Sequence, residues 1–179
     1  MGWQNRNSRN QQHLHCLWQK KLCSACKKGL PSHCQTRTVT GIINHDGAFA
    51  DEVKVAAGTL HEIPSNVDPL IATLTEPLAA ALQTFEMTPI EKDKTLVVLG
   101  PGKIGILIIF AASLKGIKTI AISRSKAKRN RALEFGAQHA FAPEIAIEEI
   151  NKLTEGLGSD FVVDTTGNPD GITQAFKLV

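Results

Sequence analysis

Short apolar runs alternate with longer segments of helical pattern over the second half of the chain. Because strands that alternate with helices of this length form βαβ units, the pattern predicts an α/β fold with a doubly wound parallel sheet. In the common strand order 3-2-1-4-5-6, four such strands lie in the order 3-2-1-4, and strand 4 becomes an open edge. The predicted strands cover residues 95–99, 119–122, 139–141 and 160–164, and the predicted helices cover residues 106–114, 125–135, 145–153 and 172–178.

The preceding segment carries shorter β-prone runs separated by turn residues. Residues 38–43 and 48–55 flank a turn, and residues 60–64 end at a proline. These runs predict three short strands. Helix starts are predicted at Asp68-Pro69 and at residues 75–77, because a capping residue or a proline at the first helical position is typical of a helix N-terminus.

A glycine-rich turn joins the first predicted strand of the second half to its helix. The turn has the pattern G-x-G-x-x-G between a strand and a helix, with a second strand following, which is the context that dinucleotide binding requires. The first glycine permits the turn, the second lets the backbone approach a pyrophosphate, and the third allows close helix–strand packing. The sequence therefore predicts a partial Rossmann-type sheet, with a glycine-rich turn that binds no ligand as the alternative. The candidate cofactor-binding residues are Gly100, Gly102, Lys103, Ile104 and Gly105.

The end of the second predicted strand indicates which nicotinamide cofactor fits. An Asp or Glu at this position binds the ribose 2′-OH of NAD, but the chain has Ser123-Arg124-Ser125-Lys126 there. A guanidinium and hydroxyls suit a 2′-phosphate, so NADP is favoured over NAD, with Ser123, Arg124 and Lys128 as candidate ligands. The alternative is that this basic run is the solvated face of the next helix.

All four cysteines lie within a short segment near the N-terminus. The chain shows no apolar stretch typical of a secretory signal, so crowded cysteines indicate a metal site more than disulfides. Cys23, Cys26 and Cys34 are the main candidates for a structural zinc site, and Cys16 is the candidate fourth ligand. The alternative is a set of reduced thiols without metal. His13, His15 and His33 are further candidates for the fourth position.

Composition excludes two classes and reveals an uneven charge. The chain has 179 residues, 42% of them hydrophobic, which argues against wholesale disorder, and no apolar run reaches the roughly 18 residues of a membrane span. The net charge of +3 is unevenly distributed. Residues 1–45 contain seven Lys/Arg and no acidic residue, whereas the remainder contains 13 basic and 17 acidic residues. Residues 1–22 are interpreted as a poorly ordered tail, with organelle targeting as an alternative and nucleic-acid binding as a weaker one. The predicted location is cytoplasmic.

Several phrases of the sequence resemble the medium-chain dehydrogenase/reductase family, in its zinc-containing alcohol dehydrogenase group. They are C-x2-C-x7-C from Cys23, GAFADEVKV, LHEIP, TEPLAAAL, VVLGPGKIG, FGA and VVDTTGNPDG, and they extend from about residue 23 to residue 179. The resemblance implies that residues 23–66 are a remnant of the β-rich catalytic domain with its cysteine lobe. It implies that residues 67–179 are a truncated NAD(P)-binding domain. Residues 1–22 have no match in the family. The resemblance also implies an NAD(P)- and zinc-dependent oxidoreductase that acts on an alcohol or polyol.

The chain departs from the family pattern at its metal ligands. The structural-zinc lobe of the family has the pattern C-x2-C-x2-C-x7-C, whose first position here is Lys20, and Cys16 is four places out of register. The mismatch suggests a replaced N-terminal segment. The G-x-C-x-x-D and G-H-E motifs of the catalytic zinc do not occur in this sequence. By resemblance to the polyol dehydrogenases, Glu76 matches a residue at or near that zinc.

These departures predict little activity of the chain by itself. The resemblance implies hydride transfer, and it leaves a homo-oligomer or pairing with a full-length relative as possible assemblies. Two other interpretations remain open, a non-catalytic nucleotide-binding remnant or regulator, and an interaction protein built on a basic zinc module.

Overall fold

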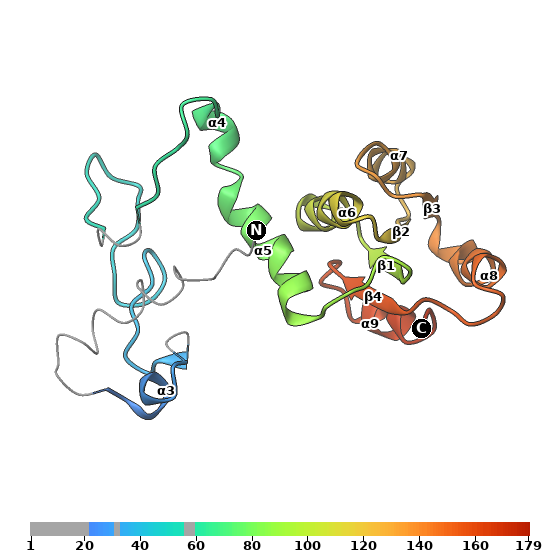
Figure 1. Cartoon of the computed structure of the whole chain (residues 1–179), viewed down its shortest axis with the longest axis horizontal. Coiled ribbons are helices and arrows are strands. Elements are labelled where there is room, and N and C mark those ends of the chain that lie inside the picture. Colours follow the sequence, from blue (N-terminus) through green and yellow to red (C-terminus); the bar gives the residue numbers. More distant parts are fainter. Residues whose placement is uncertain (1–21, 31–32, 56–59) are drawn as a thin grey trace. The chain divides into compact units, whose positions relative to one another are not determined.

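The computed structural model describes residues 22–30, 33–55 and 60–179 (Figure 1). The chain divides into two compact units, Met1–Pro64 and Ser65–Val179. The first unit contains one short helix in its described part, α3 (Ser24–Lys27). The second unit contains the strands β1 (Thr95–Leu99), β2 (Lys118–Ile122), β3 (His139–Phe141) and β4 (Phe161–Asp164), and the helices α4 (Pro69–Ala72), α5 (Thr75–Met87), α6 (Lys103–Lys115), α7 (Lys126–Glu134), α8 (Pro143–Leu153) and α9 (Pro169–Ala175).

The four strands form one parallel sheet in the order β3-β2-β1-β4. The predicted α/β fold and the predicted strand order are therefore confirmed. β1 lies inside the sheet, where Val97 is in register with Ile120 of β2 and with Val162 of β4. β4 lies at one edge of the sheet, as the order requires.

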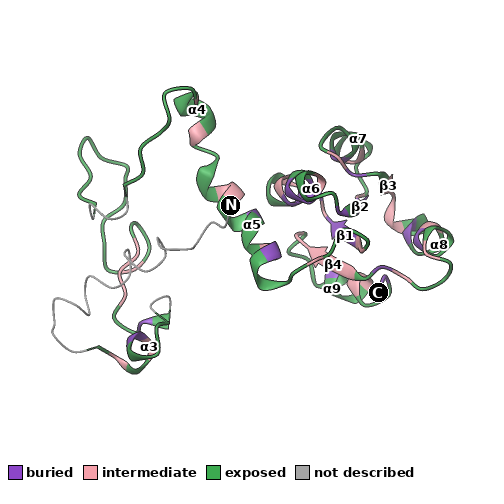
Figure 2. Cartoon of the chain, in the orientation of Figure 1, coloured by how far each residue is buried: buried purple, intermediate pink, exposed green. Residues whose placement is uncertain are grey.

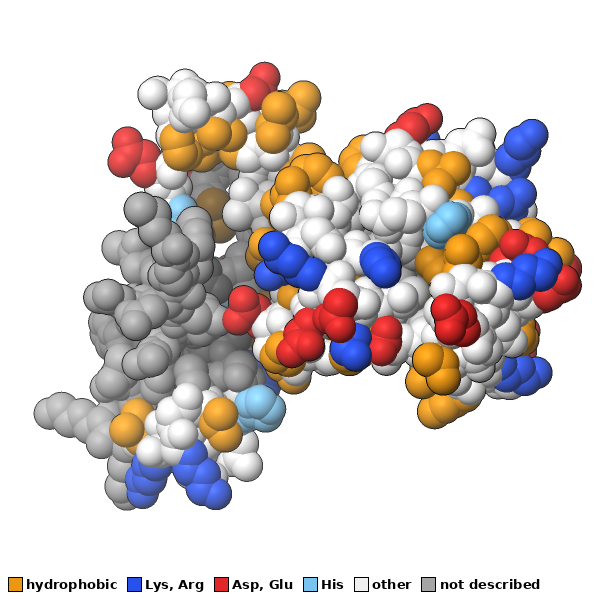
Figure 3. Space-filling view, turned by 45° about the vertical axis from the view of Figure 1, so that its right-hand side comes forward, with side chains coloured by type: hydrophobic (Ala, Val, Ile, Leu, Met, Phe, Trp, Pro, Cys, Tyr) orange, Lys and Arg blue, Asp and Glu red, His pale blue; other side chains and the backbone are white. Residues whose placement is uncertain are grey.

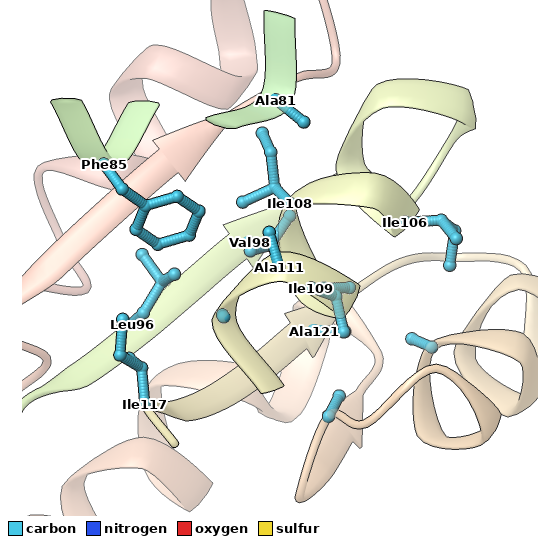
Figure 4. Packing of buried hydrophobic residues seen from close by; sticks show 13 residues of the cluster. Ala81, Phe85, Leu96, Val98, Ile106, Ile108, Ile109, Ala111, Ile117 and Ala121 are labelled. Carbon is cyan, nitrogen blue, oxygen red and sulfur yellow. The ribbon is translucent and has the colours of Figure 1, made fainter. Parts of the chain in front are cut away.

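Helices cover both faces of the sheet. This arrangement buries β1, whose side chains are apolar on both faces. Leu96 and Val98 pack in the cluster that includes buried residues of α5 and α6 (Figure 4), whereas Val97 and Leu99 pack against α8 and the segment around Leu178. Successive side chains of a strand point to opposite faces, and a strand buried on both faces reads as a continuous apolar run. The burial is concentrated in β1, β2 and the inner side of α6 (Figure 2).

Two helices begin three residues before their predicted starts. α6 begins at Lys103, because the last residues of the glycine pattern, up to Gly105, already form its first turn. α9 was predicted at 172–178 but spans Pro169–Ala175. Its earlier start follows from the Asn168 side chain, which accepts a hydrogen bond from the Asp170 N–H and caps a helix with proline at its first position.

The three strands predicted at 38–43, 48–55 and 60–64 are wrong for the described residues of these segments. They contain only an isolated antiparallel bridge between Val39 and Ile43. A strand is stable only when a neighbour satisfies its backbone groups, and the described part of this unit provides no such neighbour. The tail predicted at 1–22 lies outside the described residues apart from Leu22, which is exposed.

None of the helices among the described residues is long and apolar enough to cross a membrane. On the face that Figure 3 presents, basic and acidic side chains are interspersed.

A charged contact joins the starts of β1 and β4. One Asp160 carboxylate oxygen accepts a hydrogen bond from the Thr95 N–H at 2.8 Å, and the other lies 3.4 Å from the Lys94 Nζ. The Thr95 N–H, assisted by Lys94, lowers the pKa of Asp160 below its usual value. The ionised carboxylate therefore stabilises the folded state at a pH above the pKa that Asp160 has in the unfolded chain. This stabilisation is lost as the pH falls through the lower pKa that Asp160 has in the folded chain.

We expect Asp160→Asn to lower the free energy of unfolding at pH 7 by about 0.5 kcal/mol, since both partners are partly exposed and screened. Urea unfolding at pH 7 and at pH 3 measures this difference, which should shrink at the lower pH. Asp93→Asn is the matched control, because it removes a nearby carboxylate that makes no hydrogen bond or ion pair within the described part of the chain. A difference that grows on acidification contradicts the prediction.

Candidate functional site

A cleft of about 500 Å³ opens at the carboxyl ends of β1, β2 and β4. β1 continues into α6 on one face of the sheet, whereas the connection from β3 to β4 runs through α8 on the other face. The cleft therefore lies at the topological switch point, where open α/β sheets bind ligands. Its lining residues are Leu99, Gly100, Gly102, Ile122, Ser123, Arg124, Ser125, Lys128, Pro143, Thr165, Thr166, Asn168, Asp170, Gly171 and Gln174.

Three glycines shape the turn between β1 and α6 in different ways. Gly100 has a φ of +78°, and a Cβ there would lie 2.7 Å from the Thr166 Cγ2. A Cβ at Gly105 would lie 2.6 Å from the Gly100 carbonyl oxygen and 2.9 Å from the Thr165 Oγ1. At Gly102 the nearest atom to such a Cβ is the Gly100 oxygen, at 3.8 Å. Positions 100 and 105 thus need glycine for the fold, while position 102 lines the cleft with its backbone uncovered.

The N-terminus of α6 has no side-chain cap and no acidic residue in its first turn. By contrast, α7 is capped by the Ser125 hydroxyl and α9 by the Asn168 side chain. N–H groups at an uncapped helix N-terminus bind anions well. Lys103 and Ile104 lie in this first turn with exposed side chains outside the cleft lining, so their contribution to such a site is their backbone N–H groups.

The loop after β2 places two cations at the cleft. Arg129 fixes the loop, because its guanidinium donates to the Ser123 carbonyl oxygen at 2.6 Å and to the Arg124 carbonyl oxygen at 3.0 Å. The exposed Arg124 and Lys128 side chains line the cleft and make no hydrogen bond or ion pair within the described part of the chain. This loop is therefore well placed to bind an anionic group.

The carboxyl end of β4 supplies cleft residues that the sequence analysis missed. Thr165 joins β4 to β1, since its Oγ1 donates to the carbonyl oxygens of Gly100 at 2.6 Å and Leu99 at 3.1 Å. Asp170 is the one carboxylate among the described lining residues. The signal that could have found them was the predicted order 3-2-1-4, because carboxyl ends of adjacent parallel strands meet at one edge of the sheet. The missed residues with polar side chains are Thr165, Thr166, Asn168, Asp170 and Gln174.

Three cysteines come together in the first unit. The Sγ atoms of Cys23, Cys26 and Cys34 all lie within 4.8 Å of one another, with Cys23 and Cys34 separated by 3.9 Å. Four thiolates at about 2.3 Å from a zinc ion lie about 3.8 Å apart, so the donor chemistry and spacing fit three of four zinc ligands. The backbone N–H of Cys26 lowers the pKa of the Cys23 thiol, which favours the thiolate. Cys16 lies outside the described residues.

The remaining candidate metal ligands do not join a cluster. His33 is exposed and is not a member of the three-cysteine group. Glu76 lies in the first turn of α5, exposed and outside the cleft lining. Among the described residues, no second group of three potential ligands gathers around it.

The chain is similar to zinc-binding dehydrogenases in comparisons with known proteins. The family model described as "Zinc-binding dehydrogenase" matches residues 104–179. L-threonine 3-dehydrogenase of Pyrococcus furiosus is 33% identical over 160 residues, which cover 88% of this chain and 45% of that protein. Sorbitol dehydrogenase of Halalkalibacterium halodurans is 34% identical over 161 residues, which cover 88% of this chain and 47% of that protein. The chain thus spans about half the length of the curated relatives that it matches.

A similar fold occurs in a solved structure with a cofactor. The crystal structure of a zinc-binding dehydrogenase from Sinorhizobium meliloti, bound to NADP, superposes with a TM-score of 0.78 at 31% sequence identity. The match covers 88% of this chain and 47% of that chain.

Proposed function

We propose that this chain, which belongs to the zinc-binding dehydrogenase family, binds NADP in the cleft at the carboxyl ends of β1, β2 and β4. In this proposal the chain is the cofactor-binding part of an oxidoreductase that transfers hydride to or from an alcohol or polyol, as the family's chemistry implies. The observation that carries the proposal is the meeting of two anion-binding features in one cleft, the uncapped N-terminus of α6 and the Arg124/Lys128 loop.

The residues of the cleft fit the two ends of an adenosine-containing cofactor. The N–H groups of the first turn of α6 suit the pyrophosphate, because the backbone at Gly102 is uncovered and the helix dipole favours negative charge. The Arg124 guanidinium and the Ser123 hydroxyl suit a ribose 2′-phosphate, with Lys128 as a further cation. When bound, the cofactor supplies a nicotinamide that accepts or donates hydride.

The choice between NADP and NAD depends on the loop after β2. We expect Arg124→Ala to weaken NADPH binding about tenfold, since it removes a charge-assisted hydrogen bond at an exposed site. NADH binding should change little, because NADH has no 2′-phosphate. Fluorescence titration of both cofactors against the 179-residue chain measures the two Kd values.

Arg131→Ala is the matched control for this experiment, because Arg131 is an exposed arginine of α7 that does not line the cleft. It should leave both Kd values near those of the unmodified chain. Equal losses of NADPH and NADH affinity in Arg124→Ala, or tighter binding of NADH by the unmodified chain, would contradict the assignment of NADP.

The alternative function is nucleotide binding without turnover, as in a regulator. It is supported by the exposed position of Glu76 and by the single three-ligand group within the described residues. An assay with NADP, zinc and either sorbitol or L-threonine separates the two functions. NADPH formation supports the oxidoreductase, whereas cofactor binding without NADPH formation supports the regulator. A third interpretation, an interaction protein built on a basic zinc module, depends on zinc binding by the cysteine cluster, and a metal analysis that finds no zinc would exclude it.

A further inference from the structure

The loop after β4 contacts the glycine-rich turn between β1 and α6. We propose that Thr165 is a positioning residue for nucleotide binding, because its hydroxyl holds the backbone from Gly100 to Gly102 in one conformation. In that conformation the turn presents the first N–H groups of α6 to a pyrophosphate. This role rests on the proposed binding of NADP in the cleft, and it brings β4 into a site that the glycine pattern places between β1 and α6.

The Thr165 hydroxyl is directed at the backbone of β1 and its turn. The Thr165 Oγ1 donates to the Gly100 carbonyl oxygen at 2.6 Å and to the Leu99 carbonyl oxygen at 3.1 Å. A hydroxyl has a single proton to donate, so a proton shared by two carbonyls is not available to the oxygens of a phosphate. Although Thr165 lines the cleft, it therefore acts on a nucleotide through the turn.

The Gly100 carbonyl is the point at which the turn is fixed. Its oxygen also accepts a hydrogen bond from the Gly102 N–H at 2.6 Å, and the Gly100 φ of +78° sets the direction of the chain. The orientation of this carbonyl defines the peptide plane before Pro101, and with it the path to Gly102, the N-cap residue of α6. The bond from Thr165 restricts rotation of that plane, so the phosphate site is organised before the ligand arrives.

Thr165 is itself held in place from β1, β4 and α6. Its N–H donates to the Leu99 carbonyl oxygen at 3.0 Å, which continues the pairing of β1 with β4. The next N–H, that of Thr166, donates to the Asp164 Oδ1 at 2.8 Å. A Cβ at Gly105 would lie 2.9 Å from the Thr165 Oγ1, so the glycine of α6 leaves the space through which the hydroxyl reaches the turn.

Two substitutions of Thr165 separate the hydroxyl from the rest of the side chain. Thr165→Val removes the hydroxyl and keeps a β-branched side chain of similar shape. The Leu99 carbonyl keeps the Thr165 N–H as a donor and the Gly100 carbonyl keeps the Gly102 N–H, so the variant leaves neither acceptor unpaired and should fold. Thr165→Ser keeps the hydroxyl and loses only the methyl group.

Thr119→Val is the matched control. Thr119 is a buried threonine of β2 whose hydroxyl donates to the Ile117 carbonyl oxygen at 3.2 Å, and it does not line the cleft. The control therefore removes a hydroxyl that bonds to the backbone of the same sheet, away from the glycine turn.

Fluorescence titration of the 179-residue chain with NADPH is the first measurement. We expect Thr165→Val to weaken NADPH binding about tenfold, the effect of one hydrogen bond, and Thr165→Ser to restore most of the affinity. Thr119→Val should bind NADPH as the unmodified chain does. NADPH binding by Thr165→Val that equals that of the unmodified chain, or a Thr165→Ser chain as weak as Thr165→Val, overturns the proposal.

Adenosine 2′-monophosphate separates positioning of the turn from a general distortion of the cleft. It carries the phosphate expected at Arg124 and Lys128 but has no pyrophosphate for the first turn of α6. Its affinity, measured by displacement of NADPH and corrected for the NADPH Kd of each chain, should therefore be the same in Thr165→Val and in the unmodified chain. Equal losses for both ligands overturn the positioning role. An unmodified chain that binds no NADPH refutes the proposed function and this role together, before any variant is compared.

Discussion

Gly105→Ala should lower the free energy of unfolding by about 3 kcal/mol, at the upper end of the cost of overpacking. The added Cβ would lie 2.6 Å from the Gly100 carbonyl oxygen and 2.9 Å from the Thr165 Oγ1. The Gly100 oxygen cannot move away cheaply, because it belongs to the backbone and accepts hydrogen bonds from the Thr165 hydroxyl and the Gly102 N–H. Insertion of a methyl group therefore separates α6 from the ends of β1 and β4.

Thermal and urea unfolding, followed by far-UV circular dichroism, measure this effect. A loss of about 3 kcal/mol corresponds to a decrease in Tm of roughly 10 °C for a unit of this size. Gly102→Ala serves as the control, since its Cβ meets only ordinary contacts. A Gly105→Ala chain with the Tm of the unmodified chain would show that α6 can shift without cost.

Gly102→Ala should instead lower the affinity for NADPH, by about 100-fold, with little change in Tm. Gly102 lines the cleft as the N-cap residue of α6, and its missing side chain leaves the backbone uncovered. A methyl group there would hold a pyrophosphate away from the N–H groups of the first turn, and a loss of about 2.7 kcal/mol corresponds to this factor. NADH should lose affinity by the same factor, because both cofactors contain the pyrophosphate.

Titration of both cofactors separates this effect from that of Arg124→Ala, which should affect NADPH alone. Gly47→Ala is an unrelated glycine control in the first unit, where φ is not positive and the nearest atom to a Cβ, the Gly41 Cα, lies at 3.4 Å. If Gly102→Ala bound NADPH as tightly as the unmodified chain, the pyrophosphate would have to lie elsewhere. Nucleotide binding at the N-terminus of α6 would then be wrong, even if the fold were unchanged.

Predictions from local pattern succeeded where the structure is itself local. The strand, glycine turn, helix and second strand of the βαβ unit are consecutive, so periodicity and the spacing of Gly100, Gly102 and Gly105 were sufficient to place them. The helix predicted over residues 125–135 corresponds to α7, and the Ser125 side chain caps it by accepting a hydrogen bond from the Lys128 N–H three residues later. The start of α9 differs from the prediction, because it depends on the Asn168 side-chain cap.

Predictions failed where a segment depends on a neighbour. The β-prone runs at 38–43 and 48–55 have the composition of strands, but the described residues include no partner strand for them. β-propensity reflects packing and pairing on a sheet more than an intrinsic preference of the backbone. The runs therefore remain outside the regular structure.

By itself the sequence determined the α/β class, the strand order and the glycine turn, because each depends on residues close together in the chain or on a general rule of chain connection. Only the tertiary structure decided which residues share the cleft. Thr165 and Asp170 meet Gly102 there because β4 pairs with β1, which lies more than 60 residues earlier in the chain. The crowding of Cys23, Cys26 and Cys34 in the chain already predicted that these residues share one site. The folded backbone decided the separations of their Sγ atoms, which all lie within 4.8 Å of one another.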